Sequence, residues 1–311
     1  MSVISRRLSV ALFVGVARTA TKSFLRINQD FGHEQNRNRM FNPTLYVKQN
    51  QLQRRDVGLV LQDMIHRLQW NQEEHILDVG CGPGDITTSV LSNYLPDDVK
   101  IVGCDISENM IKYAQQTFES KRFSFKQLDV GNSNIWMNWE EESFDKIFSF
   151  YCLHWVKDLK QAAENMNTLL KKGGELITFT PVSHPFFELF KKIYNDPKWR
   201  EQMKVMKTYD ALFRGFDHQQ YVETLKACGF EILSAEVREW SYSHASMEQF
   251  LEYLESVNPF VKRVNIDKAK ELIEDCAAIL LEAGHLKKKK NDNVVHEYTT
   301  LTVHARKLFQ V

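Results

Sequence analysis

The segment that decides the fold is Ile76-Leu77-Asp78-Val79-Gly80-Cys81-Gly82-Pro83-Gly84-Asp85, a short apolar run that ends in a GxGxG turn. The glycines of this turn let the backbone bend sharply and approach a ligand more closely than a side chain would allow. A glycine-rich turn after a strand is weak evidence on its own, because dinucleotide-binding enzymes use a similar one. The spacing of the residues around the turn therefore decides which ligand it fits.

The residue that follows the turn argues against a dinucleotide. The dinucleotide fingerprint has a third glycine three positions after the second, where this chain has Asp85, and a carboxylate there would repel a pyrophosphate. Asp78, at the end of the apolar run, instead offers an anion to a cationic ligand. S-adenosylmethionine carries an ammonium and a sulfonium and has no phosphate, so it is the predicted cofactor. The turn residues predicted to hold it together with Asp78 are Gly80, Cys81, Gly82 and Gly84.

Two more acids stand at the ends of the next two apolar runs. Asp105 can accept both hydroxyls of a ribose, and Asp129 can accept from an adenine amino group while Val130 offers its backbone N–H. Ile106 and Met110 complete the predicted cofactor set. One such aspartate is explained equally well as a cap. Three of them at the ends of three consecutive strands predict a shared site instead.

Short apolar runs alternate with amphipathic ones from residue 74 onward, which is typical of βα units around a parallel sheet. The predicted strands are 75–79, 100–105, 123–130, 144–150 and 174–180, followed by a later pair, 231–242 and 294–307, at one sheet edge. The predicted helices are 45–68, 86–94, 108–118, 159–170 and 218–228. Ser107 is predicted to cap the helix at 108–118. Gly173-Gly174 is predicted to end the helix at 159–170.

An acidic GxGxG loop with acids after the second and third strands resembles class I S-adenosylmethionine-dependent methyltransferases over about residues 74–181. The resemblance implies an α/β, Rossmann-like fold with a seven-stranded, mostly parallel sheet and helices on both faces. Residues 40–311 are predicted to form a single domain, with a helical cap insertion around 182–217. The aromatic side chains of this insertion either line the pocket or form the core of a helical subdomain; they are Phe186, Phe187, Phe190, Tyr194, Trp199 and Phe213.

Several segments closely resemble insect juvenile hormone acid methyltransferases. They are residues 42–56 (NPTLYVKQNQLQRRD), 103–107 (GCDIS), 148–155 (FSFYCLHW), 258–260 (NPF) and 305–308 (ARKL). This family transfers a methyl group from S-adenosylmethionine to the carboxylate of farnesoic acid or juvenile hormone acid, and the resemblance implies the same reaction here. A carboxylic acid is already ionised at neutral pH, so no catalytic base is predicted.

The same resemblance places Gln53 and Trp155 where the family holds its substrate. Each can donate an N–H to a carboxylate, and Trp155 adds a large apolar plate. The alternatives are a solvated helix face for Gln53 and a core aromatic for Trp155. His154 is either a donor to the substrate carboxylate or a hydrogen-bonded structural histidine. Because one fold serves many acceptors, two alternatives stay open. The chain is either a methyltransferase of another small carboxylate or hydroxyl, or a cofactor-binding protein without turnover.

Composition restricts the partners. Lys and Arg number 40, as do Asp and Glu, so no net positive charge attracts nucleic acid. The one dense basic run, 287–290, is interpreted as a solvated helix end or loop. Five scattered cysteines favour reduced thiols in a cytoplasmic protein without a metal site. The expected partner is a small apolar carboxylic acid, with no nucleic acid and no stable membrane insertion, and the oligomeric state is left open.

Residues 1–39 differ from the rest of the chain. They are basic, have no acid before Asp30, and contain a short apolar run at 8–17. That run is too short to span a bilayer, which takes about 20 apolar residues. The segment is interpreted either as an extension upstream of a start at Met40 or as a mitochondrial or secretory targeting segment.

Overall fold

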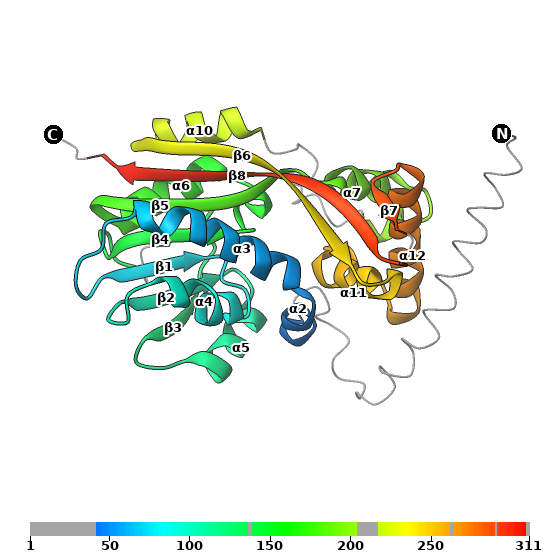
Figure 1. Ribbon diagram of the computed structural model, residues 1–311, viewed down its shortest axis with the longest axis horizontal. Coiled ribbons are helices and arrows are strands. Elements are labelled where there is room, and N and C mark those ends of the chain that lie inside the picture. Colours follow the sequence, from blue (N-terminus) through cyan, green and yellow to red (C-terminus); the bar gives the residue numbers. More distant parts are fainter. Residues whose placement is uncertain (1–41, 136–138, 204–216, 262–263, 290, 309–311) are drawn as a thin grey trace, which may run out of the picture. The chain divides into compact units, whose positions relative to one another are not determined.

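The computed structural model describes residues 42–135, 139–203, 217–261, 264–289 and 291–308 (Figure 1). The predicted N-terminal extension and Phe213 lie outside these ranges. Within the described residues the chain divides into two compact units. The larger is drawn from 43–135, 139–187, 217–240 and 298–308, and the smaller from 188–203, 241–261, 264–289 and 291–297. The assignment of residues 40–311 to one methyltransferase domain remains a prediction.

A central sheet follows the strand order β3-β2-β1-β4-β5-β8-β6, with the short strand β7 paired to β8 off this path. The strands are β1 (His75–Val79), β2 (Lys100–Asp105), β3 (Phe123–Gln127), β4 (Phe144–Phe150), β5 (Leu170–Ser183), β6 (Phe230–His244), β7 (Leu286–Lys288) and β8 (Val294–Lys307). Strands β1 to β5 pair in parallel, and β8 runs antiparallel to β5. The predicted Rossmann-like α/β fold is confirmed, including the pairing of the two late strands; β7 was not predicted.

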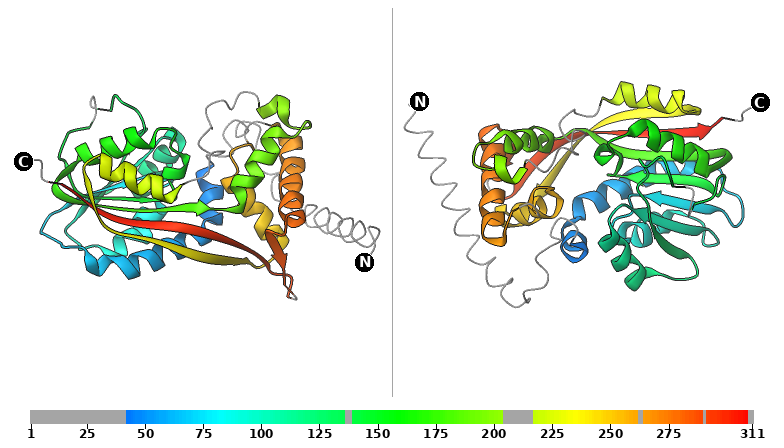
Figure 2. Two further views of the ribbon diagram at one scale, coloured as in Figure 1. Left: turned by 90° about the horizontal axis from the view of Figure 1, so that it is seen from above. Right: turned by 180° about the vertical axis from the view of Figure 1, so that it is seen from behind.

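Helices cover both faces of the sheet (Figures 1 and 2). One face carries α3 (Gln51–Met64), α4 (Asp85–Ser89) and α5 (Glu108–Phe118), and the other carries α6 (Leu159–Leu169) and α10 (His218–Ala227). Ser107 caps α5 by accepting the backbone N–H of Met110, as predicted. On the opposite face Ala162, Met166 and Leu225 pack against Leu77 and Ile147 in one apolar core. Coverage of both faces is typical of a sheet whose strands pair in parallel.

The smaller unit contains most of α7 (Pro185–Asn195), together with α8 (Arg200–Met203), α11 (Met247–Val257) and α12 (Ile266–Glu282). Phe190 packs edge-on against Phe260, with ring centroids 5.4 Å apart. The indole N–H of Trp199 donates to Asp275 over 2.9 Å. Phe190 and Trp199, predicted either as pocket wall or as subdomain core, are thus buried aromatic residues within this unit. No described helix is both long and apolar enough to cross a membrane.

Several predicted boundaries were wrong. Strand β3 ends at Gln127 instead of Val130. The predicted helix 45–68 is broken at Asn50, which separates α2 (Pro43–Gln49) from α3. Strand β5 begins directly after α6, so the glycine pair at 173–174 does not end that helix. The pairing of β4 with β5 shifts register between Phe144 and Lys146, and the glycines supply the extra residues of this irregularity.

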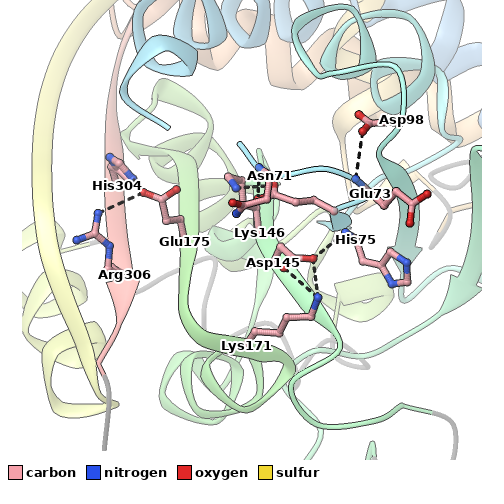
Figure 3. A network of polar contacts seen from close by, with 11 residues as sticks. Asn71, Glu73, His75, Asp98, Asp145, Lys146, Lys171, Glu175, His304 and Arg306 are labelled. Carbon is pink, nitrogen blue, oxygen red and sulfur yellow. Dashed lines mark hydrogen bonds and ion pairs between the residues drawn. The ribbon is translucent and has the colours of Figure 1, made fainter. Parts of the chain in front are cut away.

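A buried ion pair lies at the amino ends of the strands, in the network of polar contacts drawn in Figure 3. The ammonium of Lys146 lies 2.5 Å from the carboxylate of Glu74, and the two side chains are 3% and 2% exposed. The same ammonium faces the ring of Trp70 at 4.4 Å. Nearby, Lys171 pairs with Asp145 at 2.8 Å in a more exposed position.

Replacing Lys146 with Met should leave the carboxylate of Glu74 buried without its cation. Breaking one side of a buried pair lowers the free energy of unfolding by about 3–5 kcal/mol. Lys171→Met is the matched control, because an exposed pair contributes at most about 1 kcal/mol. Urea unfolding followed by far-UV circular dichroism measures both values, and equal losses for the two variants would contradict the prediction.

Candidate active site

The turn after β1 passes very close to the end of β4. Gly80 has a φ of 80°, and a Cβ at this position would lie 2.3 Å from the Cβ of Cys152. Gly84 has a φ of 83°, and its Cβ would lie 2.8 Å from the ring of Phe125. A side chain at either position would have to displace its neighbour and also strain the backbone. The glycines therefore keep the turn compact at the carboxyl end of the sheet.

Asp78 is a buried carboxylate at the end of β1, only 2% exposed. It accepts a hydrogen bond from the hydroxyl of Thr87 in α4 over 2.6 Å. Burial raises the pKa of Asp78 to about 7, the Thr87 bond opposes this shift, and the negative charge of Asp105 adds to it. No Lys, Arg or His in the described part of the chain forms an ion pair with Asp78. A cationic ligand would favour its ionised form.

Asp105 ends β2 and accepts two backbone hydrogen bonds. The N–H of Gly82 donates to one oxygen over 3.1 Å, and the N–H of Ser107 donates to the other over 2.8 Å. Burial raises the pKa of Asp105 above its usual value, although both bonds favour the charged form. Each oxygen keeps a lone pair for a further donor, such as a ribose hydroxyl. Beside it, Ile106 is 57% exposed and Met110 is buried.

Asp129 and Val130 lie beyond the end of β3. The Asp129 side chain is exposed and accepts the backbone N–H of Gly131 over 3.0 Å. This bond agrees with the alternative that Asp129 is a capping residue. Val130 is buried in the core beside α6, and its carbonyl accepts from the Asn165 amide over 2.8 Å. Contacts of these two residues with an adenine ring remain a prediction.

A cavity lies at the carboxyl end of β1, within the larger unit. Its lining residues are Tyr46, Gln53, Val57, Asp78, Gly80, Cys81, Gly82, Ile86, Phe150 and Tyr151. Four of the predicted cofactor residues thus surround the same space as Gln53. Gln53 is 4% exposed, which excludes the solvated helix face. Its side-chain oxygen is buried and has no hydrogen-bond partner among the described residues, so it is available to a ligand.

His154 and Trp155 belong to a 3₁₀ turn, Leu153–Trp155, that follows β4. The Nδ1 atom of His154 lies 3.2 Å from the hydroxyl of Thr180. Burial, with a smaller contribution from His184, lowers the pKa of His154 to about 3. The imidazole is therefore neutral at physiological pH. The half-buried ring of Trp155 packs on it at 5.0 Å. Neither residue is among those that line the cavity.

Sequence reasoning missed two tyrosines of the cavity. Tyr46 is partly buried, and burial together with the carboxylates of Asp85 and Asp105 raises its pKa above the usual range. Tyr151 has a positive φ of 52°, which no sequence pattern announced. Helical spacing relates Gln53 to Val57 within α3, but Tyr46 lies in α2, before the break at Asn50, so no sequence pattern indicated that it lines the same cavity.

The side chains at the carboxyl end of the sheet fit S-adenosylmethionine. The buried carboxylate of Asp78 and the partly buried carboxylate of Asp105 lack a cationic partner in the described chain, and the compact turn leaves its backbone close to the cavity. Asp78 and the turn would hold the cationic end of the cofactor, and Asp105 its ribose. Among the described residues, no cluster of His, Cys, Asp or Glu could hold a metal ion.

The fold and the acidic cradle define a class I S-adenosylmethionine-dependent methyltransferase. The chain belongs to the methyltransferase-domain family, whose model matches residues 71–229, more than half of its length. It is similar to the juvenile hormone acid O-methyltransferase of Drosophila melanogaster, at 28% identity over 85% of this chain and 91% of the relative. The Bombyx mori protein of the same name is 26% identical over 86% of this chain and 98% of its own.

A solved structure shares the fold. Phosphoethanolamine N-methyltransferase 2 of Haemonchus contortus superposes with a TM-score of 0.52 at 17% identity. The match covers 87% of this chain and 58% of that one, which was determined with phosphomonomethylethanolamine and S-adenosylhomocysteine. At this identity the likeness establishes the fold alone.

Cofactor affinity should depend on the charge of Asp78. Because the pKa of Asp78 is about 7, lowering the pH from about 8 to about 6 should protonate it and weaken S-adenosylmethionine binding about tenfold. Calorimetric titration across this range measures the effect. Asp78→Asn should abolish binding, whereas Asp129→Asn, at an exposed acid, should keep the wild-type pH profile. A flat wild-type profile would show that Asp78 does not face the cation.

Proposed function

We propose that this methyltransferase transfers a methyl group to the carboxylate of a small apolar acid, and that farnesoic acid or juvenile hormone acid is its substrate. The observation that carries the proposal is the buried, polar side chain of Gln53 in the cavity that also contains Asp78. The remaining lining includes the apolar Val57, Ile86 and Phe150. The names of the two insect relatives, which are acid O-methyltransferases, support a carboxylate acceptor.

Positioning and exclusion of water suffice for this chemistry. S-adenosylmethionine supplies a methyl group on a positively charged sulfur. An ionised carboxylate is already a nucleophile and needs no base. This agrees with the lowered pKa of His154, about 3, because a buried imidazole with so low a pKa is a poor proton acceptor at neutral pH. The apolar lining favours a reaction in which opposite charges are neutralised, because water stabilises the separated charges better than the product.

Gln53 and Trp155 are proposed to orient the acid. A half-turn of the Gln53 amide exchanges its oxygen and nitrogen, so the N–H group can face the carboxylate. Trp155 would place its ring along the apolar chain of the acid. His154, fixed by Thr180, would keep the Trp155 ring in place or donate to the carboxylate itself.

A substrate panel tests the proposal. The full chain is incubated with radiolabelled S-adenosylmethionine and, separately, with farnesoic acid, juvenile hormone acid, a saturated fatty acid and a tricarboxylic acid. Label in the methyl ester of either isoprenoid acid is the expected result. Label only in another acid would change the substrate but keep the reaction. Cofactor binding without transfer to any acid would overturn the proposed function.

Gln53→Glu should impair use of the acid because it replaces a hydrogen-bond donor with a negative charge of the same shape. Loss of one hydrogen bond to a charged group should lower kcat/KM for the acid by at least about tenfold. Cofactor affinity should be kept, since an added anion does not oppose a cation. Gln51→Glu, on the exposed face of α3, is the matched control. Equal activity of the two variants would remove Gln53 from the substrate site.

A further inference from the structure

Asp56 is a fully buried carboxylate in α3 that the proposed chemistry does not use. It lies one helical turn after Gln53, so the two side chains project from the same face of α3. A buried charge persists only where hydrogen bonds and an opposite charge compensate the loss of water. The groups that compensate Asp56 come from the end of β4 and from β8.

Two tyrosine hydroxyls converge on one oxygen of Asp56. The hydroxyl of Tyr151 donates over 2.5 Å, and the hydroxyl of Tyr298, in β8, donates to the same atom. Arg55 lies 2.7 Å from the other oxygen and also donates to the hydroxyl of Tyr298 over 3.0 Å. An ionised carboxylate is an acceptor only, so both phenols are oriented as donors toward it.

Tyr151 is held in a conformation that it would not adopt alone. Its φ of 52° lies in the left-handed region, which is unfavourable for an aromatic residue. The backbone N–H of Tyr151 donates to the carbonyl of Phe179 over 2.8 Å, and its ring packs edge-on against the Phe179 ring at 5.1 Å. The hydrogen bond to Asp56 fixes the hydroxyl of Tyr151 in addition to its backbone and its ring. Tyr151 is thereby held as one wall of the cavity.

Tyr298 also contacts a residue at the end of β5. Its ring lies 5.3 Å from the ring of His184, which follows β5 directly. Asp56 therefore joins α3, the end of β4 and β8 through contacts within the larger unit. Gln53 and Tyr151 line one cavity, and both are placed by elements that meet at this carboxylate.

We propose that Asp56 is a positioning residue for methyl transfer: its bonds to Tyr151 and Tyr298 fix the part of α3 that presents Gln53 to the acid substrate. Arg55 compensates the charge of Asp56, so that this carboxylate does not repel the carboxylate of the substrate. The inference rests on the proposed function, because that function assigns Gln53 to the acid. It adds a residue that touches neither the cofactor nor the acid.

The test compares Asp56→Asn with Asp63→Asn. Both change an aspartate of α3 to its amide, but Asp63 is 59% exposed and pairs only with Arg238 among the contacts of the described chain. Asp56→Asn should lower kcat/KM for the acid by about tenfold, with a raised KM, because misplacement of a binding group weakens alignment. The dissociation constant for S-adenosylmethionine should stay within about threefold of the wild-type value. Asp63→Asn should match the wild type in both.

Tyr151→Phe keeps the aromatic ring in the cavity lining but removes its hydrogen bond to Asp56. This variant tests the inference if Asp56→Asn fails to fold. Tyr151→Phe should raise KM for the acid, as Asp56→Asn should. A merely structural role would lower the amount of active protein and therefore kcat, with KM for the acid unchanged, and that result would overturn the inference. Unchanged kinetics in both variants would do so as well, with the proposed function intact. A wild-type protein that methylates no acid would instead overturn the proposed function and this inference together.

Discussion

The close approach of two backbones at the carboxyl end of the sheet is the constraint on which the site depends. At Gly80 only a hydrogen atom fits against the Cβ of Cys152. This contact allows the turn after β1 to lie against the segment after β4, while the two strands pair directly, Leu77 opposite Ile147. As a result, Asp78 at the end of one strand and Tyr151 at the end of the other line one cavity.

Buried and partly buried charges of the described residues differ in how they are compensated. Lys146 and Glu74 neutralise each other, and Asp56 is compensated by Arg55 and two hydroxyls. Asp78 and Asp105 have only hydrogen-bond donors beside them in the described chain, and burial raises the pKa of both. Compensated charges join elements of the fold. Uncompensated carboxylates favour an external cation or donor, which supports the prediction that Asp78 and Asp105 hold the cofactor.

The cavity combines this need for a cation with an apolar lining. A methyl donor with a positive sulfur and an acceptor with a negative carboxylate suit such a place, since both charges disappear in the reaction. The neutral His154 fits the same chemistry, because the acceptor has no proton to remove. Under our proposals the side chains therefore contribute by orientation: Gln53 in the cavity lining and Trp155 outside it act directly on the acid, and Asp56 acts through the tyrosines it holds.

The sequence by itself determined the succession of strands along the chain up to β5, the glycine turn after β1 and the positions of Asp78 and Asp105 at strand ends, because periodicity and strand ends are local properties of the chain. It could not determine that Asp129 accepts the backbone N–H of Gly131, that Gln53 is buried or that Tyr151 adopts a positive φ. Those features depend on contacts between distant segments. Asp56 bonds to residues 95 and 242 positions away, and only the tertiary structure brings such residues together, because their meeting requires the whole sheet to form between them.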